Sequence, residues 1–182
     1  MQVLEIITDA CLVEPNIGIG ACICRIAKKD VKQKTQIIKS IWLFNATASF
    51  EAEIMTGIKA ITKSKEITLS DKIEILWSCD LSYLDELLKN SSSAQNSRMK
   101  ELLEEVRILT KDDILEVSYP RQPSIVRYHN GCHRICSALR KGILENPLNL
   151  TTSYQISKKV LEKYTNWNFL GCDVSKDSQA ST

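Results

Sequence analysis

The chain has 182 residues, 43% of them hydrophobic, which is the size of a single domain with a substantial core. Its 24 basic and 22 acidic residues leave a formal net charge of +2, so the overall charge neither requires nor excludes a nucleic-acid partner. No uninterrupted apolar stretch is long enough to span a bilayer, and we expect no association with a membrane.

Three strands are predicted at the start of the chain. The apolar run at residues 3–8 ends at Asp9, and the segments at 18–27 and 35–44 have a strand-like pattern. Turn-forming residues separate the first two segments, and a charged run separates the second from the third. We therefore expect a three-stranded meander.

The next segment has the period of a helix. Apolar residues recur at helical spacing from Phe50 to Ile61, and Ser49 is the predicted N-cap. Glu51 and Glu53 fall in the first turn, where the helix dipole favours negative charge.

The remaining elements alternate between strand and helix. Strands are predicted at 72–78 and 114–119, and helices at 81–88, 99–109, 132–143 and 152–164, with a Ser-rich break at 90–96 and a loop rich in Pro and Arg before residue 132.

This order predicts an α/β fold with a mixed five-stranded sheet (order β-β-β-α-β-α-β-α) and flanking helices. Its parallel part is expected from the first, fourth and fifth strands. We expect residues 1–145 to form this domain and residues 146–172 to be a helical extension packed on it. Residues 173–182 are polar and small, and a flexible tail is expected there.

The seven cysteines are odd in number and lie mostly in apolar runs, so we expect small core residues in a reduced, cytoplasmic protein. No secretory signal is recognised after Met1. Cys132 and Cys136 flank His133, but a fourth ligand and a second CxxC pair are missing, which argues against a structural zinc site.

Three carboxylates have a pattern that predicts one site. Asp9 and Asp80 each end an apolar strand, and the carboxyl ends of parallel strands meet at one sheet edge. Glu53 follows the meander in the first turn of a helix. Three acids together repel unless a cation neutralises them, and oxygen ligands of this kind suit Mg²⁺ or Mn²⁺. Taken singly, each Asp is more often a turn or cap residue, and Glu53 a solvated helix residue.

Several segments, spanning about Val3 to Ile143, resemble type I ribonuclease H. The segment Ala52-Glu53-Ile54-Met55 is similar to the family's AELMA-type helix. Four further similarities are weaker. Thr8-Asp9 is similar to the family's TDGS strand end, and Gly18-Ile19-Gly20-Ala21 is similar to its G-x-G-A strand. Cys79-Asp80-Leu81-Ser82-Tyr83 is similar to its TDS-x-Y element, and Tyr119-Pro120-Arg121 with residues 129–136 is similar to its late V-P-R…N-x-x-A-D/H-x-L-A segment.

The resemblance implies a ribonuclease-H-like fold and an endoribonuclease that hydrolyses the RNA strand of RNA–DNA hybrids with two Mg²⁺ or Mn²⁺ ions. Asp9 would bridge the ions, and Glu53 and Asp80 would each complete one. His133 takes the place of the fourth acidic ligand, and its alternative is an ordinary half-exposed helix residue.

The same resemblance implies a nucleic-acid partner, either a hybrid or RNA. Arg121, Arg127 and Arg134 are the candidate phosphate contacts, and the alternative is a solvated helix face. The oligomeric state is not predicted.

The chain also departs from the family. Ser49 and Phe50 replace a pair of Asn that touches the substrate, Glu51 replaces an Arg, and no His matches the family's mobile catalytic His. The main alternative is therefore a catalytically weak or inactive module that binds nucleic acid or a protein. A third possibility is another nuclease or a transposase-type member of the superfamily.

Overall fold

The computed structural model describes residues 2–13, 16–28, 35–68, 72–90, 94, 96–145, 150–164 and 166–173. The strands are β1 (Gln2–Val13), β2 (Ile17–Lys28), β3 (Gln36–Asn45), β4 (Ile73–Ser78), β5 (Ile114–Ser118) and β6 (Asn168–Asp173). The helices are α1 (Ser49–Glu66), α2 (Leu84–Lys89), α3 (Ser97–Leu109), α4 (Pro123–Leu144) and α5 (Leu150–Leu161).

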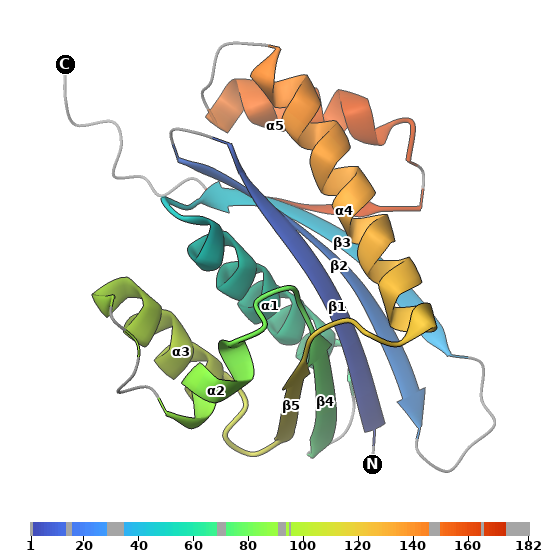
Figure 1. The fold of residues 1–182 in the computed structure, drawn as a ribbon. Helices are drawn as coiled ribbons and strands as arrows, with labels where there is room; N and C mark the ends of the chain where they lie inside the picture. Colours follow the sequence, from blue (N-terminus) through green and yellow to red (C-terminus); the bar gives the residue numbers. More distant parts are fainter. Residues whose placement is uncertain are drawn as a thin grey trace.

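The strands form one six-stranded mixed sheet in the order β5-β4-β1-β2-β3-β6 (Figure 1). β1, β2 and β3 are the antiparallel meander that the sequence predicts. β4 runs parallel to both β1 and β5, so the prediction for the parallel part is also confirmed.

The sixth strand was not predicted. β6 pairs in parallel with the edge strand β3 and lies almost entirely within residues 146–172, for which the sequence predicts only a helix. α5 supplies that helix. The tail prediction falls on residues 174–182, outside the described residues, except for Asp173 at the end of β6. The division of the chain at residue 145 stays a prediction.

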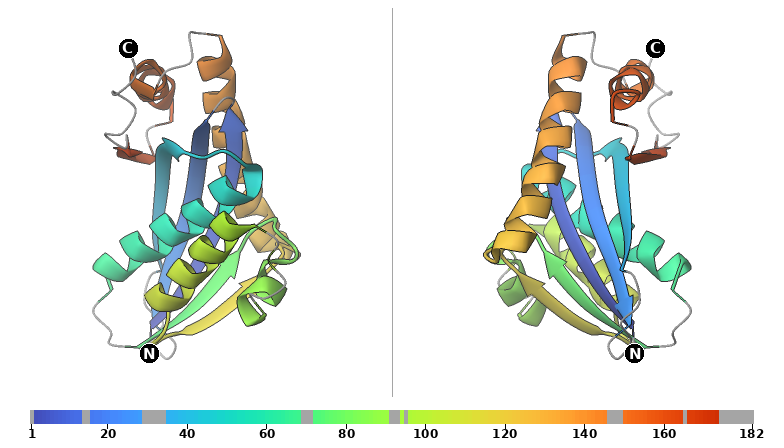
Figure 2. Two further views of the ribbon diagram at one scale, coloured as in Figure 1. Left: turned by 90° about the vertical axis from the view of Figure 1, so that its left-hand side faces the viewer. Right: turned by 90° about the vertical axis from the view of Figure 1, so that its right-hand side faces the viewer.

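Helices cover both faces of the sheet (Figure 2). Successive strand residues point to opposite faces, so one strand can serve two cores. Leu4 and Ile6 of β1 pack toward α1 and α3 in one core. Ile19 of β2 and Ile41 of β3 pack in the other with the stripe Cys132, Cys136, Leu139 and Ile143 of α4, which the sequence predicts correctly.

Three local predictions were wrong. β1 continues past Asp9 to Val13, because β2 pairs with it along its whole length. The N-cap of α1 is Ala48, which makes no side-chain cap, and Ser49 is already helical. α4 begins at Pro123, nine residues earlier than predicted, because proline suits the first turn of a helix, where its missing N–H is not needed.

Of the six cysteines whose side chains are described, five are buried and Cys11 is partly buried, as expected for core residues. Trp42 and Trp77 are also buried. Across the described part of the chain, every helix falls short of the length or apolar character that crossing a membrane requires.

One close approach joins α1 to the sheet. Gly57 lies directly against the ring of Trp77, so that a methyl group at position 57 would overlap the indole. Trp77 is completely buried, and the tight contact sets how closely the helix that carries Glu53 approaches β4.

We predict that Gly57→Ala destabilises the protein by about 1–3 kcal/mol, because the Trp77 ring must move in a packed core. The measurement is urea unfolding. Gly131→Ala is the matched control: its nearest outside atom would be Ile23 Cδ1 at 3.4 Å, and this helical position should be neutral or gain up to about 1 kcal/mol. Equal unfolding midpoints for Gly57→Ala and the wild type would contradict the prediction.

Candidate metal centre

The register of the parallel strands brings two acids together. The pairing of β1 with β4 ends at Ile7 and Ser78, and Asp9 and Asp80 each lie two residues beyond this last pair. Asp9 remains in the ladder with β2, opposite Ala21, and is only 3% exposed. Asp80 follows the end of β4 and is exposed. The two carboxylates therefore sit at one edge of the sheet, as the sequence predicts.

Helix α4 adds two imidazoles to this edge. His129 Nε2 lies 3.7 Å from Asp9 Oδ1, and His133 Nδ1 lies 3.3 Å from Asp9 Oδ2. The residues are four positions apart, so they occupy the same side of the helix one turn apart. The His129 side chain is 16% exposed and that of His133 is 66% exposed, so His133 forms the rim of the site.

Glu53 approaches from the other helical layer. Thr8 Oγ1 donates a hydrogen bond to Glu53 Oε1 at 2.9 Å and accepts one from Trp77 Nε1, also at 2.9 Å. The Ala10 backbone N–H also donates to the Glu53 carboxylate. Glu53 is 3% exposed, so its position is fixed by β1 and β4.

The carboxylates of these acids repel one another. Burial, and then repulsion by Asp80 and Asp9, raises the pKa of Glu53 from 4.5 to about 8 despite its hydrogen bonds. Burial also raises the pKa of Asp9; Asp80 adds to the rise, and the nearby His129 and His133 oppose it. Both carboxyl groups would ionise more readily beside a cation.

The donors fit a divalent cation. One ligand atom each from Asp9, Asp80 and His129 lie within 4.8 Å of one another. His129 Nε2 is buried and makes no hydrogen bond. Carboxylate oxygens with an imidazole nitrogen are a usual ligand set for first-row divalent ions. A cleft of about 380 Å³ opens beside these residues and is also lined by Tyr119 and His133.

The structure thus brings Asp9, Asp80 and His133 to one cleft. Glu53 is buried close enough to both acids for their charges to raise its pKa. His129 was missed by the sequence analysis. Its signal is present, four residues before His133, but the Pro- and Arg-rich pattern before residue 132 predicts a loop, which hides the helical spacing.

Glu51, the other acid in the first turn of α1, has a structural role. Its carboxylate accepts hydrogen bonds from the Thr47 backbone and hydroxyl at 2.7 and 2.9 Å, and pairs with Arg98 Nε at 2.9 Å. Glu51 therefore fastens the entry of α1 and links it to α3.

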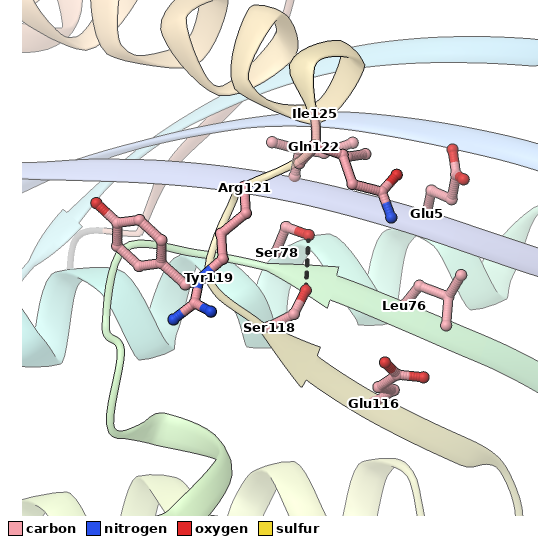
Figure 3. Close-up of a pocket in the computed structure, with 10 residues that line it drawn as sticks. Glu5, Leu76, Ser78, Glu116, Ser118, Tyr119, Arg121, Gln122 and Ile125 are labelled. Carbon is pink, nitrogen blue, oxygen red and sulfur yellow. Dashed lines mark hydrogen bonds between the residues drawn. The ribbon is translucent and has the colours of Figure 1, made fainter.

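The three candidate arginines lie at different places on α4 and in the segment before it. Arg121 lies in the segment between β5 and α4 and, with Tyr119, lines a second hollow of about 310 Å³ over the free face of β4 and β5 (Figure 3). Arg127 and Arg134 are exposed on α4, seven residues apart and hence on one side of the helix. Their contact with nucleic acid stays a prediction.

No family model matches the chain, and no curated protein matches it either. Solved structures do match. Ribonuclease H1 from the halophilic archaeon Halobacterium salinarum is 16% identical, with 69% of this chain and 90% of that chain covered and a TM-score of 0.50. LC9-RNase H1, described as a type 1 enzyme with the type 2 active-site motif, is 10% identical, with 71% and 68% covered and a TM-score of 0.53.

These similarities show that the chain has the ribonuclease-H-like fold, as the sequence resemblance predicts. At this level of identity they show the fold alone.

The raised pKa of Glu53 predicts how stability depends on pH. Between about 4.5 and 8 the unfolded chain loses the Glu53 proton while the metal-free folded protein keeps it, so stability falls as pH rises through this window. Asp9, whose pKa is also raised, adds to the same trend. Glu53→Gln cannot ionise and should flatten the slope, by up to about 3 kcal/mol between pH 5 and pH 7.

The measurement is urea unfolding in EDTA at several pH values. Glu104→Gln on the exposed side of α3 is the matched control and should keep the wild-type slope. A Glu53→Gln slope equal to that of the wild type would show that Glu53 is already ionised in the folded protein.

Proposed function

We propose that the protein is a metal-dependent ribonuclease of the RNase H type, which hydrolyses the RNA strand of RNA–DNA hybrids. One observation carries the proposal: buried Asp9 and Glu53 lie close to Asp80, and no Lys or Arg of the described residues neutralises the three acids. Among the ion pairs of the described residues, none joins Lys or Arg to any of these acids. Buried carboxylates without such a partner are costly, and a bound cation would offset that cost.

Asp9, Glu53, Asp80 and His133 would hold Mg²⁺ or Mn²⁺. When bound, two such ions activate the attacking water and stabilise the leaving oxygen of the phosphodiester. The two oxygens of Asp9 face different imidazoles, so this carboxylate is suited to the bridging role. The hydrogen bonds to Glu53 hold it in place before substrate arrives.

His133 is suited to moving protons at the rim of the cleft. Its side chain is largely exposed, so its imidazole can pass a proton between Asp9 and solvent water. As a neutral ligand it brings no negative charge, so the ion beside it would be held less tightly than by a fourth carboxylate.

Arg121, Arg127 and Arg134 would bind the phosphate backbone of the substrate. Arg121 lies in the segment before α4 and Arg127 and Arg134 lie along α4, the helix that carries His129 and His133 of the cleft, which supports this role. The two solved structures compared above are named as ribonucleases H1, which supports a nucleic-acid substrate.

A non-catalytic binding module is the second candidate. Ser49 and Phe50 stand where the family has its substrate-contacting Asn pair, and a histidine stands in place of the fourth acid. The histidine in place of the fourth acid would weaken catalysis more than binding, so an inactive protein that still binds hybrids would support this second function.

The proposal predicts that Asp9→Asn lowers Mg²⁺- or Mn²⁺-dependent cleavage of an RNA–DNA hybrid by at least about 100-fold, because a bridging ligand without charge holds two cations poorly. Cleavage of labelled hybrid, double-stranded RNA and double-stranded DNA is measured in each metal, with circular dichroism as the folding control.

Asp112→Asn is the matched variant, an exposed carboxylate in the turn before β5, and should cleave like the wild type. No cleavage by the wild type in either metal would favour the binding module. An Asp9→Asn variant as active as the wild type would refute the proposed site.

The arginines generate a separate binding prediction. The double variant Arg127→Ala/Arg134→Ala should weaken hybrid binding uniformly across sequences and reduce the slope of log affinity against log salt by about 1 for each lost phosphate contact. Fluorescence anisotropy at several salt concentrations measures both quantities. Lys111→Ala, exposed in the turn before β5, is the control. An unchanged slope in the double variant would mean that α4 faces solvent in the complex.

A further inference from the structure

The two histidines on α4 are the only histidines in the chain, and both contact the same acid. His129 faces Asp9 Oδ1, and His133 faces Asp9 Oδ2. One carboxylate is thus shared between two imidazoles. The histidines differ in setting, because the His129 side chain is mostly buried and the His133 side chain is mostly exposed.

His129 Nε2 is buried without a hydrogen-bond partner. A buried polar atom in this state is unfavourable, and it occurs here at the wall of the acidic cleft. The nearest charged atom is Asp9 Oδ1 at 3.7 Å, too far for a hydrogen bond. The distance between His129 Nε2 and Asp9 Oδ1 is one that two ligands of the same ion would have.

The spacing agrees with that interpretation. Two atoms that each lie about 2.1 Å from one ion can be at most about 4.2 Å apart, and 3.7 Å is inside this limit. The third ligand atom, from Asp80, completes a group whose members lie within 4.8 Å of one another. Asp80 is exposed, so its side chain has room to close the remaining distance.

A nitrogen ligand changes which metals the group prefers. Mg²⁺ prefers oxygen ligands and keeps much of its water, whereas Zn²⁺ and other late first-row ions accept imidazole readily. Asp9 and Asp80 alone would suit Mg²⁺. With His129 added, the group has one borderline donor and two hard donors.

We propose that His129, Asp9 and Asp80 form a cation subsite that takes a nitrogen-accepting first-row ion, of which Zn²⁺ is the clearest probe, in preference to Mg²⁺. This inference rests on the metal-binding part of the function proposed above but not on hydrolysis. His133 lies at the other oxygen of Asp9 and is largely exposed, so it would hold an ion outside this subsite.

One consequence is that Zn²⁺ would compete with the Mg²⁺ that the ribonuclease activity requires. Nearly every mixed site binds Zn²⁺ more tightly than Mg²⁺, so the preference alone is not diagnostic. The diagnostic quantity is the decrease in the ratio of Zn²⁺ affinity to Mg²⁺ affinity when the His129 nitrogen is removed.

The test uses the whole untagged chain, stripped with EDTA and free of nucleic acid. Because the chain has two histidines, its imidazole C–H signals in NMR spectra form two sets, which His129→Gln and His133→Gln assign. One equivalent of Zn²⁺ should shift the His129 signals to saturation, and millimolar Mg²⁺, which would bind the neighbouring carboxylates but not the ring, should shift them much less.

Calorimetry of the same samples gives the affinities. His129→Gln should weaken Zn²⁺ binding at least tenfold while Mg²⁺ affinity stays within about twofold, and His133→Gln should weaken Zn²⁺ binding less. Cys11→Ser controls for zinc on the one described thiol that is not fully buried, and should bind Zn²⁺ like the wild type. Thermal unfolding in EDTA checks that each variant is folded.

Three results would overturn the inference: Zn²⁺ binding without a shift of the His129 signals, equal loss of Zn²⁺ and Mg²⁺ affinity in His129→Gln, or loss of Zn²⁺ binding in Cys11→Ser alone. Failure of the ribonuclease proposal looks different. In that case Zn²⁺ still shifts His129 and His129→Gln still changes the metal preference, but no nucleic acid is cleaved.

Discussion

Two consecutive hydrogen bonds hold the site and the fold in register. The indole of Trp77 donates to Thr8, and Thr8 donates to Glu53, so β4, β1 and α1 are joined by three buried side chains. Gly57 makes this possible, because any larger residue would displace the indole. The carboxylate of Glu53 is therefore positioned by the core itself, before any ligand is considered.

Strand β1 connects this arrangement to helix α4 on the opposite face of the sheet. Thr8 and Asp9 are neighbours in an extended strand, so they point to opposite faces. Thr8 meets α1 through Glu53, and Asp9 meets α4 through its histidines. At the point where the pairing of β1 with β4 ends, the two faces come together around Asp80. The electrostatic cost of this arrangement is visible in the raised pKa values of Glu53 and Asp9.

The sequence predicted what periodicity and strand ends encode, namely the meander, the parallel strands, the face of α1 and the three acids. The predictions were wrong where tertiary contacts determine the secondary structure. The first turns of α4 bury few side chains and contain Asn130 and Gly131, so they resemble a loop, and His129 was lost with them. β6 is short and has no strong alternating pattern, and it forms because β3 offers an unpaired edge.

We propose that Asp9, Glu53 and Asp80 together hold divalent cations. The most direct measurement is anomalous diffraction from crystals soaked in Mn²⁺. We expect peaks on both sides of the Asp9 carboxylate, one of them within coordination distance of Asp80 and another within reach of Glu53. Maps without a peak between Asp9 and Asp80 at saturating Mn²⁺ would contradict it, and would leave the buried acids without a function in catalysis.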